Sequence, residues 1–204
     1  MRSTSSWLLA AFAATLVILA GVGSAAANRL SVSQRTFSAT WIPQEEPVRT
    51  ENITIEETFG LQVICEMQLS GSFHSSTMVK TAGALIGYVN GASFGGTCPA
   101  RMLRETLPWH VRYRNFTGVL PTIASVGISV IGLAIRIPIG GTECLVRSEA
   151  TNPARFNFNL NEVGRMRTTS ADATATIPGT GGCAFSTFRL KGTGTAGSVT
   201  VRLI

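Results

Sequence analysis

The sequence predicts an all-β protein, and three observations support that prediction. Charged residues make up only 14% of the 204 residues, where an ordinary soluble domain has about 25%, so long surface helices are not expected. Apolar residues recur at every second position in several stretches, which is typical of strands with one buried face. Glycine-rich turns separate these stretches. We therefore expect a single β-sandwich domain of the Greek-key or jelly-roll kind, held by disulfides.

Residues 1–27 have the features of a secretory signal peptide. A basic Arg2 precedes an apolar run from Trp7 to Gly23, and Ala25 and Ala27 give the small-x-small pattern of a cleavage site. The run is short for a membrane anchor and ends in Gly-Ser-Ala-Ala-Ala. We expect cleavage near Ala27, no integral membrane anchor afterwards, and a secreted or cell-envelope location.

The rest of the chain divides by composition into two segments. Residues 28–59 are expected to hold an N-terminal strand and an acidic, proline-containing loop, which leads into the first core strand. Residues 60–204 are expected to form the β-sandwich domain. The acidic residues of the loop are Glu45, Glu46, Glu51, Glu56 and Glu57.

Period-two alternation marks the strands of the sandwich. The clearest apolar faces are Leu61, Val63, Cys65, Met67 and Leu69, then Phe156, Phe158 and Leu160, and finally Val199, Val201 and Leu203. Polar residues occupy the intervening positions of the last two sets, as expected for strands with one face in water.

The most apolar segment runs from Val119 to Ile139. Its glycines, its flanking prolines and Arg136 argue against a membrane helix. One apolar phase changes to the opposite one near Gly132, which is what a β-bulge produces. We expect either a central strand buried on both faces or a long strand bent between two sheets. The first phase contains Val126, Ile128 and Val130, and the second contains Ile131, Leu133, Ile135 and Ile137.

Four cysteines follow the signal segment: Cys65, Cys98, Cys144 and Cys183. An even number in an exported protein indicates two disulfides, for which three connectivities exist. We favour the pairs that are neighbours in sequence, Cys65–Cys98 and Cys144–Cys183. The absence of a C-x-x-C motif argues against zinc binding and thioredoxin-type chemistry.

The residues offer little support for catalysis. The chain has His74, His110 and a single aspartate, Asp172, and it lacks the Gly-x-Ser-x-Gly turn of serine hydrolases. The histidine spacing matches no metal motif, and no phosphate-binding glycine loop is present. We therefore expect no catalytic residues, no metal and no cofactor, and the chain is not expected to be an enzyme. A hydrolase that uses two distant carboxylates stays as an alternative.

Basic and aromatic residues gather between Arg101 and Phe116. Alternation places Trp109, Val111 and Tyr113 on one face of a strand, and His110, Arg112 and Arg114 on the other. The simplest interpretation is an ordinary strand with its aromatic face buried. The candidate binding surface is Trp109, Tyr113, Arg112 and Arg114, with an anionic cell-envelope polymer or acidic polysaccharide as partner. A nucleic acid partner is not expected.

Four short motifs suggest a family. They are Gly60-Leu61-Gln62-Val63-Ile64-Cys65, Ala92-Ser93-Phe94-Gly95-Gly96-Thr97-Cys98, Leu107-Pro108-Trp109-His110-Val111 and Val126-Gly127-Ile128-Ser129-Val130-Ile131-Gly132. Over roughly residues 60–137 the chain resembles the small secreted bacterial proteins known as activators of alkane oxidation. The resemblance implies a setting of hydrocarbon growth and surface adhesion, and it supplies no catalytic residues.

Three functions follow as hypotheses. The first is a non-enzymatic adhesive or matrix component of the cell surface, with hydrophobic surfaces or envelope polymers as partners. The second is a binding or carrier module for an apolar ligand or envelope glycan, with an internal pocket or an exposed patch around Trp41, Trp109 and Tyr113. The third is the secreted hydrolase. We expect the Leu107-Pro108-Trp109 segment to be structurally important, with Trp109 packed in the core.

Overall fold

The computed structural model describes residues 29–41, 53–57, 62–118, 123–160, 166–167, 179–180, 188–192, 194–197 and 199–204. These residues form antiparallel sheets, and the predicted all-β class is confirmed. Within them, one short 3-10 helix, η1 (Arg104–Thr106), lies between two strands.

The strands follow one another closely along the chain. They are β1 (Arg29–Val32), β2 (Thr36–Trp41), β3 (Ile53–Glu57), β4 (Gln62–Phe73), β5 (Thr77–Val79), β6 (Leu85–Gly95), β7 (Arg101–Met102), β8 (Trp109–Thr117), β9 (Ser125–Ile131), β10 (Ala134–Ile139), β11 (Thr142–Arg147), β12 (Ala154–Leu160), β13 (Met166–Arg167), β14 (Gly179–Thr180), β15 (Phe188–Gly192), β16 (Thr195–Ala196) and β17 (Val201–Leu203).

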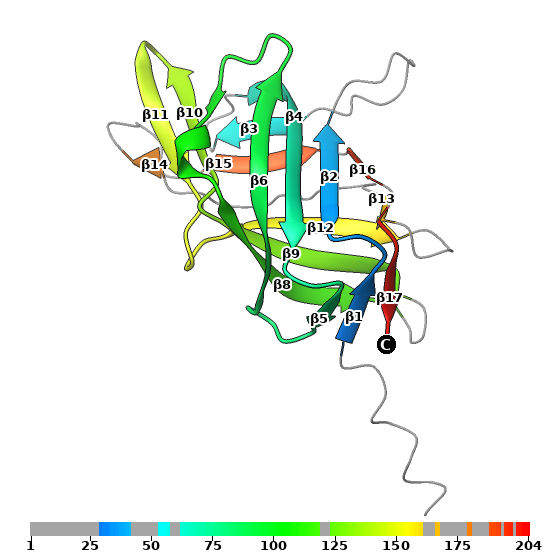
Figure 1. Cartoon of the computed structure of the whole chain (residues 1–204). Helices are drawn as coiled ribbons and strands as arrows, with labels where there is room; N and C mark the ends of the chain where they lie inside the picture. The colour runs from blue at the N-terminus through cyan, green and yellow to red at the C-terminus, as the bar shows by residue number, and fades with distance from the viewer. Residues whose placement is uncertain are drawn as a thin grey trace, which may run out of the picture.

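The largest sheet curls into two layers. Its order is β13-β12-β9-β8-β6-β4-β2-β16, and β3 and β15 join it through β4. In Figure 1, β8, β9 and β12 cross behind β6, β4 and β2. The Trp41 ring of β2 lies against the Phe156 ring of β12, with centroids 5.9 Å apart. The hydrophobic core therefore lies between the two layers of one sheet.

Strand β4 shows how the apolar pattern produces this packing. Its side chains alternate between outside and inside along the strand, and Val63, Cys65, Met67 and Leu69 all face the core. Each buried apolar side chain of this size stabilises the fold by about 1.5–3 kcal/mol. The inward faces predicted for Phe156, Phe158, Val199 and Val201 are also confirmed.

The segment around Gly132 is a long strand bent between two sheets, which was one of the two predicted alternatives. β9 belongs to the large sheet, and β10 belongs to a four-stranded sheet of order β14-β11-β10-β7. The buried positions change phase between Val130 and Leu133. Gly132 lies at the bend with φ of 95°, a conformation that costs other residues about 1–3 kcal/mol.

The N-terminal strands are built into the sheets. β1 pairs with both β17 and β5 in a three-stranded sheet, so the two ends of the described chain lie side by side. β2 and β3 each pair with β4. Core side chains run from Leu30 to Val201 in one hydrophobic cluster.

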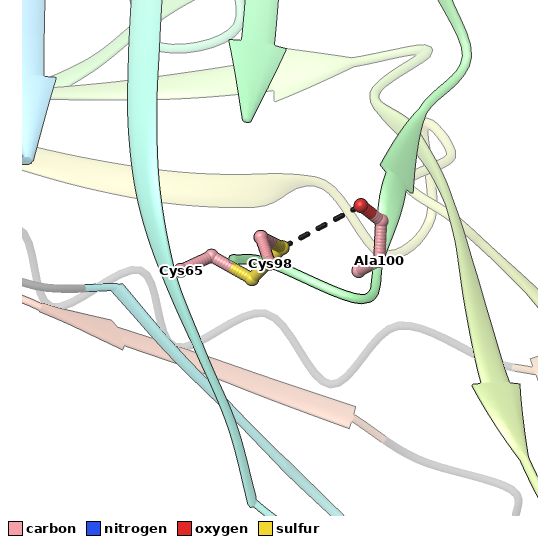
Figure 2. Close-up of a disulfide and its surroundings, with 3 residues drawn as sticks. All are labelled: Cys65, Cys98 and Ala100. Atoms are coloured by element: carbon pink, nitrogen blue, oxygen red, sulfur yellow. Dashed lines mark hydrogen bonds between the residues drawn. A yellow bond between two sulfur atoms is a disulfide. The ribbon is translucent and has the colours of Figure 1, made fainter. Parts of the chain in front are cut away.

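A disulfide joins Cys65 and Cys98, as predicted (Figure 2). Cys65 lies on the buried face of β4, and Cys98 lies in the loop after β6, with its Sγ 3.5 Å from the carbonyl oxygen of Ala100. Cys144 is buried and is also disulfide-bonded. Cys183 lies outside the described residues, so the pair Cys144–Cys183 stays a prediction.

Other predictions also fall outside the described residues. They concern the signal peptide at residues 1–27 and the loop positions Glu45, Glu46 and Glu51. The expectation that Glu56 and Glu57 lie in the same loop was wrong, because both belong to β3, which pairs with β4 and β15. In the part of the chain that the structure describes, no helix combines the length and apolar character needed to cross a membrane. The disulfide is compatible with an oxidising, extracellular location.

Candidate binding surface

Strand β8 carries the residues that the sequence singled out, and it divides them between two faces. Trp109, Val111 and Tyr113 are buried, whereas His110 is exposed and Arg112 is half-buried on the opposite face. The predicted alternation is therefore confirmed. The arginines are the part of the candidate surface that a partner can reach.

The aromatic members of the proposed patch are core residues. The exposed fractions are 0% for Trp41, 0% for Trp109 and 4% for Tyr113. The Trp109 Nε1 atom donates a hydrogen bond to Thr106 Oγ1 at 2.8 Å, which satisfies the only polar atom of the indole side chain. The exposed patch expected around these three residues does not exist, because their apolar rings fill the space between the layers.

Three arginines come together on the outer face of β8, β9 and β12, and we call them the arginine surface: Arg112, Arg114 and Arg155. In the sheet register, Arg112 lies beside Ser129 of β9, and Ser129 lies beside Arg155 of β12. Neighbouring strands are about 4.8 Å apart, so Arg112 and Arg155 stand two strands from each other. The Arg114 guanidinium donates a hydrogen bond to Asn157 Oδ1 on β12.

A glycine makes room for Arg114. A Cβ atom at Gly127 would lie 2.8 Å from Arg114 Nη2 and 2.9 Å from Arg114 Nε. The guanidinium therefore lies directly over the backbone of β9. This position is set by the rigid sheet, so little conformational entropy remains to be lost when a ligand binds.

The arginine surface holds its charges close together, and no described carboxylate forms an ion pair with them. Burial, and to a smaller degree the positive charge of Arg155, lower the pKa of Arg114. Among the described residues the one ion pair joins Arg136 to Glu143, away from these arginines. The buried Nε atoms of Arg112 and Arg114 find no hydrogen-bond acceptor within the described chain. An anionic ligand on the solvent side of these guanidinium groups would relieve the repulsion between their charges.

Arginine is suited to a particular class of anion. Its planar guanidinium presents several N–H donors in a fixed arrangement that matches the two oxygens of a carboxylate, sulfate or phosphate. Of the 17 basic residues only Lys80 and Lys191 are lysines. The arrangement therefore provides binding of oxyanions, and it places no nucleophile or general base among the three guanidinium groups.

A histidine–tyrosine cluster that the sequence analysis missed borders the arginine surface. The Tyr88 ring lies 4.8 Å from that of His74 and 5.4 Å from that of His110, between centroids. Tyr88 pairs with His110 across β6 and β8, two residues before Arg112. Arg155 was missed as well. Both depend on strand pairing, which local alternation does not reveal.

The apolar gap between the two layers is too small for a sizeable ligand. A gap between the layers is lined by apolar side chains including Leu30, Phe73, Met78 and Phe158, and its volume is about 20 Å³. That is roughly the space of one water molecule. A carrier function for an apolar ligand at this place would require the two layers to separate.

Large exposed hydrophobic side chains are few in the described residues. They are Ile64, Val79, Leu85 and Ile204. Val79 and Ile204 both pair with Arg29 on neighbouring strands, and Leu85 pairs with Arg112. Arg29 thus separates Val79 from Ile204, and Arg112 lies beside Leu85, in contrast to the contiguous apolar patch that a hydrophobic contact surface requires.

No family model, curated protein or solved structure matches the chain. The resemblance to the activators of alkane oxidation therefore stays a prediction. Among the described residues, no group of three His, Cys, Asp or Glu side chains is arranged to hold a metal ion. Conclusions about function rest on the geometry of the outer surface.

Proposed function

We propose that the chain is an exported, non-enzymatic adhesive protein that binds an anionic polymer of the cell envelope through Arg112, Arg114 and Arg155. The observation that carries the proposal is the arginine surface itself. Its three arginines stand on β8 and β12, the strands on either side of β9, and no carboxylate of the described residues forms an ion pair with them. Groups held this way bind best to a ligand that brings its own negative charge.

A polymer fits this surface better than a small anion. Arg112 and Arg155 stand two strand spacings apart, about 10 Å, so neighbouring acidic units of one chain could reach both of them. The full sequence carries a net charge of +6, of which cleavage near Ala27 removes only Arg2, and the remaining positive charge adds a long-range attraction that brings a polyanion to the molecule. Many weak contacts along one polymer would then add up to firm adhesion.

The surface gives less support to adhesion through apolar contact. Exposed hydrophobic side chains of the described residues are interrupted by Arg29 and Arg112, and the apolar gap of about 20 Å³ is too small for a hydrocarbon chain. Hydrophobic surfaces are therefore the partner that the experiment must distinguish from an acidic polymer.

Partitioning of the purified mature protein tests the proposal. The protein is mixed with beads carrying polygalacturonate, with neutral dextran beads and with alkane droplets, at low and high salt. We expect retention by the acidic beads alone, with release as the salt concentration rises, because salt screens exposed charges. A reduced and alkylated sample shows whether the folded surface is required.

Each of the other outcomes contradicts the proposal in a specific way. Adsorption to droplets without retention on acidic beads would identify hydrophobic surfaces as the partner. An oligonucleotide and free polygalacturonate are also compared as competitors that displace the protein from the acidic beads. If the oligonucleotide displaces the protein at a lower concentration of charges than polygalacturonate does, a nucleic acid partner is indicated. Shortening of the polymer during incubation would support the hydrolase alternative.

A further inference from the structure

A polar groove lies on the outer face of β2, β4 and β6, in the other layer of the large sheet. Its volume is about 450 Å³, within the range of about 300–1,000 Å³ for ligand sites. Two rows of residues cross its floor. Ser38, Ser70 and Gly91 form one row, and Thr40, Gln68 and Ser93 form the other.

The lining of the groove is uncharged except at one end. Arg104 and Leu107, at the two ends of the η1 turn, border it. Within the described residues, Gln68, Ser70 and Ser93 donate no side-chain hydrogen bond to the protein and accept none. Hydroxyl and amide groups both donate and accept, so they match a ligand that is itself rich in hydroxyl groups.

The floor is kept open on its β6 side by Gly91. A Cβ there would lie 2.5 Å from Ser70 Oγ, so a larger residue would displace the Ser70 hydroxyl. A ligand can thus approach the backbone between two rows of hydroxyl groups. This is a shaped recess in the sheet with a cation at one end.

We infer that this groove binds a short stretch of an acidic polysaccharide, with sugar hydroxyls over Gln68, Ser70 and Ser93 and a uronate carboxylate at Arg104. The inference rests on the proposed function, because it identifies the polymer as a hexuronate-containing glycan. Charge complementarity supports this occupant: the described residues of the lining offer one guanidinium and no carboxylate, and the rest are neutral hydrogen-bonding groups, Gly91 and the apolar Leu69, Ala92 and Leu107.

Paired residues of the sheet lead from the groove toward the arginine surface. Asn90, at the end of the groove, donates a hydrogen bond from Nδ2 to Ser72 Oγ at 3.0 Å, and Ser72 pairs with Tyr88. Tyr88 pairs with His110, which lies two residues before Arg112. A glycan that leaves the groove at Asn90 would therefore pass the Tyr88 ring before it reaches the arginines.

Calorimetric titration of the mature protein with tetragalacturonate tests the groove. Ser70 is exposed, so Ser70→Phe fills the groove without touching the core. Thr142→Phe, at an exposed position of β11, is the matched control. We expect at least a tenfold loss of affinity for Ser70→Phe and less than a twofold change for the control, with melting temperatures close to the wild type.

A second pair of variants tests the role of the Arg104 guanidinium. These variants still test the inference if Ser70→Phe fails to fold. Arg104→Gln removes the charge at the groove, and Arg147→Gln removes an exposed charge of β11. We expect Arg104→Gln to weaken tetragalacturonate binding while leaving the weaker binding of its methyl ester unchanged. Arg147→Gln should change neither.

The experiments distinguish an error in the groove inference from an error in the proposed function. If the polymer binds but the groove variants bind tetragalacturonate like the wild type, the groove inference is wrong and the proposed function stands. If the wild type binds the polymer but does not bind the tetramer, the groove inference is likewise wrong and the proposed function stands. If neither the tetramer nor the polymer binds, both are wrong.

Discussion

The Arg114 guanidinium lies over Gly127, where a Cβ atom would come within 2.8 Å of Arg114 Nη2 and still closer to Asn115 Oδ1. A residue of β9 that has no side chain therefore sets the position of a charged residue of β8. This relationship links the backbone of the sheet to the proposed binding surface, and it is open to direct test.

Gly127→Ala should displace Arg114 and weaken binding to polygalacturonate. We expect about a tenfold loss of affinity, since a hydrogen bond to a charged group contributes roughly 1.5–3 kcal/mol and 1.4 kcal/mol is a factor of ten. In a double-mutant cycle with Arg114→Gln the two losses should not add. Additive losses would show that Gly127 acts independently of Arg114.

Trp109→Ala should cost stability before it costs binding. The side chain is fully buried, its Nε1 donates to Thr106 Oγ1, and its Cδ1 would lie 3.3 Å from a Cβ at Gly132. Loss of so large a buried ring destabilises a domain by about 3–5 kcal/mol. Denaturant unfolding measures this loss, with Trp109→Phe as a milder variant. Wild-type stability combined with lost polymer binding would place Trp109 in the binding site instead.

Removal of the Cys65–Cys98 disulfide should lower the free energy of unfolding by about 3–4 kcal/mol, because the bond closes a long loop in the unfolded chain. Its sequence separation is 33 residues. Chemical denaturation of Cys65→Ala/Cys98→Ala against the wild type gives the difference. An unchanged unfolding midpoint would mean that the bond constrains the unfolded state little.

Alkaline pH should destabilise the fold through Tyr113. Burial raises the pKa of Tyr113 above its ordinary value of 10.0, so the folded state favours the neutral phenol. This stabilisation of the folded state is fully present below pH 10, the ordinary pKa of tyrosine. It is lost as the pH rises through the pKa of Tyr113 in the folded protein, because the tyrosine of the unfolded chain ionises first. Melting temperatures across this range should fall more steeply for the wild type than for Tyr113→Phe.

Absorbance provides the control for the alkaline experiment. The chain has two tyrosines, so in a Tyr88→Phe background the phenolate signal comes from Tyr113 alone. We expect that signal to appear together with unfolding. Ionisation of Tyr113 at its ordinary pKa while the fold stays intact would contradict the effect of burial.

The sequence predicts what depends on neighbouring positions along one strand. Alternation along β4 and β8 identified which side of each strand faces the core, because burial of apolar side chains follows the two-residue period of a strand. The change of phase at Gly132 revealed the bend between sheets for the same reason. The Cys65–Cys98 pair followed from sequence proximity.

What the sequence does not predict depends on pairing between distant strands. Arg155 joins Arg112 only because β12 pairs with β9 and β9 pairs with β8. The polar groove likewise needs the register of Ser38, Ser70 and Gly91 across three strands. Serine, threonine and glutamine at such positions look like ordinary exposed residues until that register is known.

The most direct test of the arginine surface compares two double variants with the same loss of charge. Arg112→Gln/Arg155→Gln removes two charges of the surface, and Arg29→Gln/Arg202→Gln removes two exposed charges of the three-stranded sheet. Affinity for polygalacturonate is measured by calorimetry at several salt concentrations. We predict at least a tenfold loss and a weaker salt dependence for the first pair alone. Equal losses in both pairs would show that net charge, not the arrangement of Arg112 and Arg155, determines binding, and the account would be contradicted.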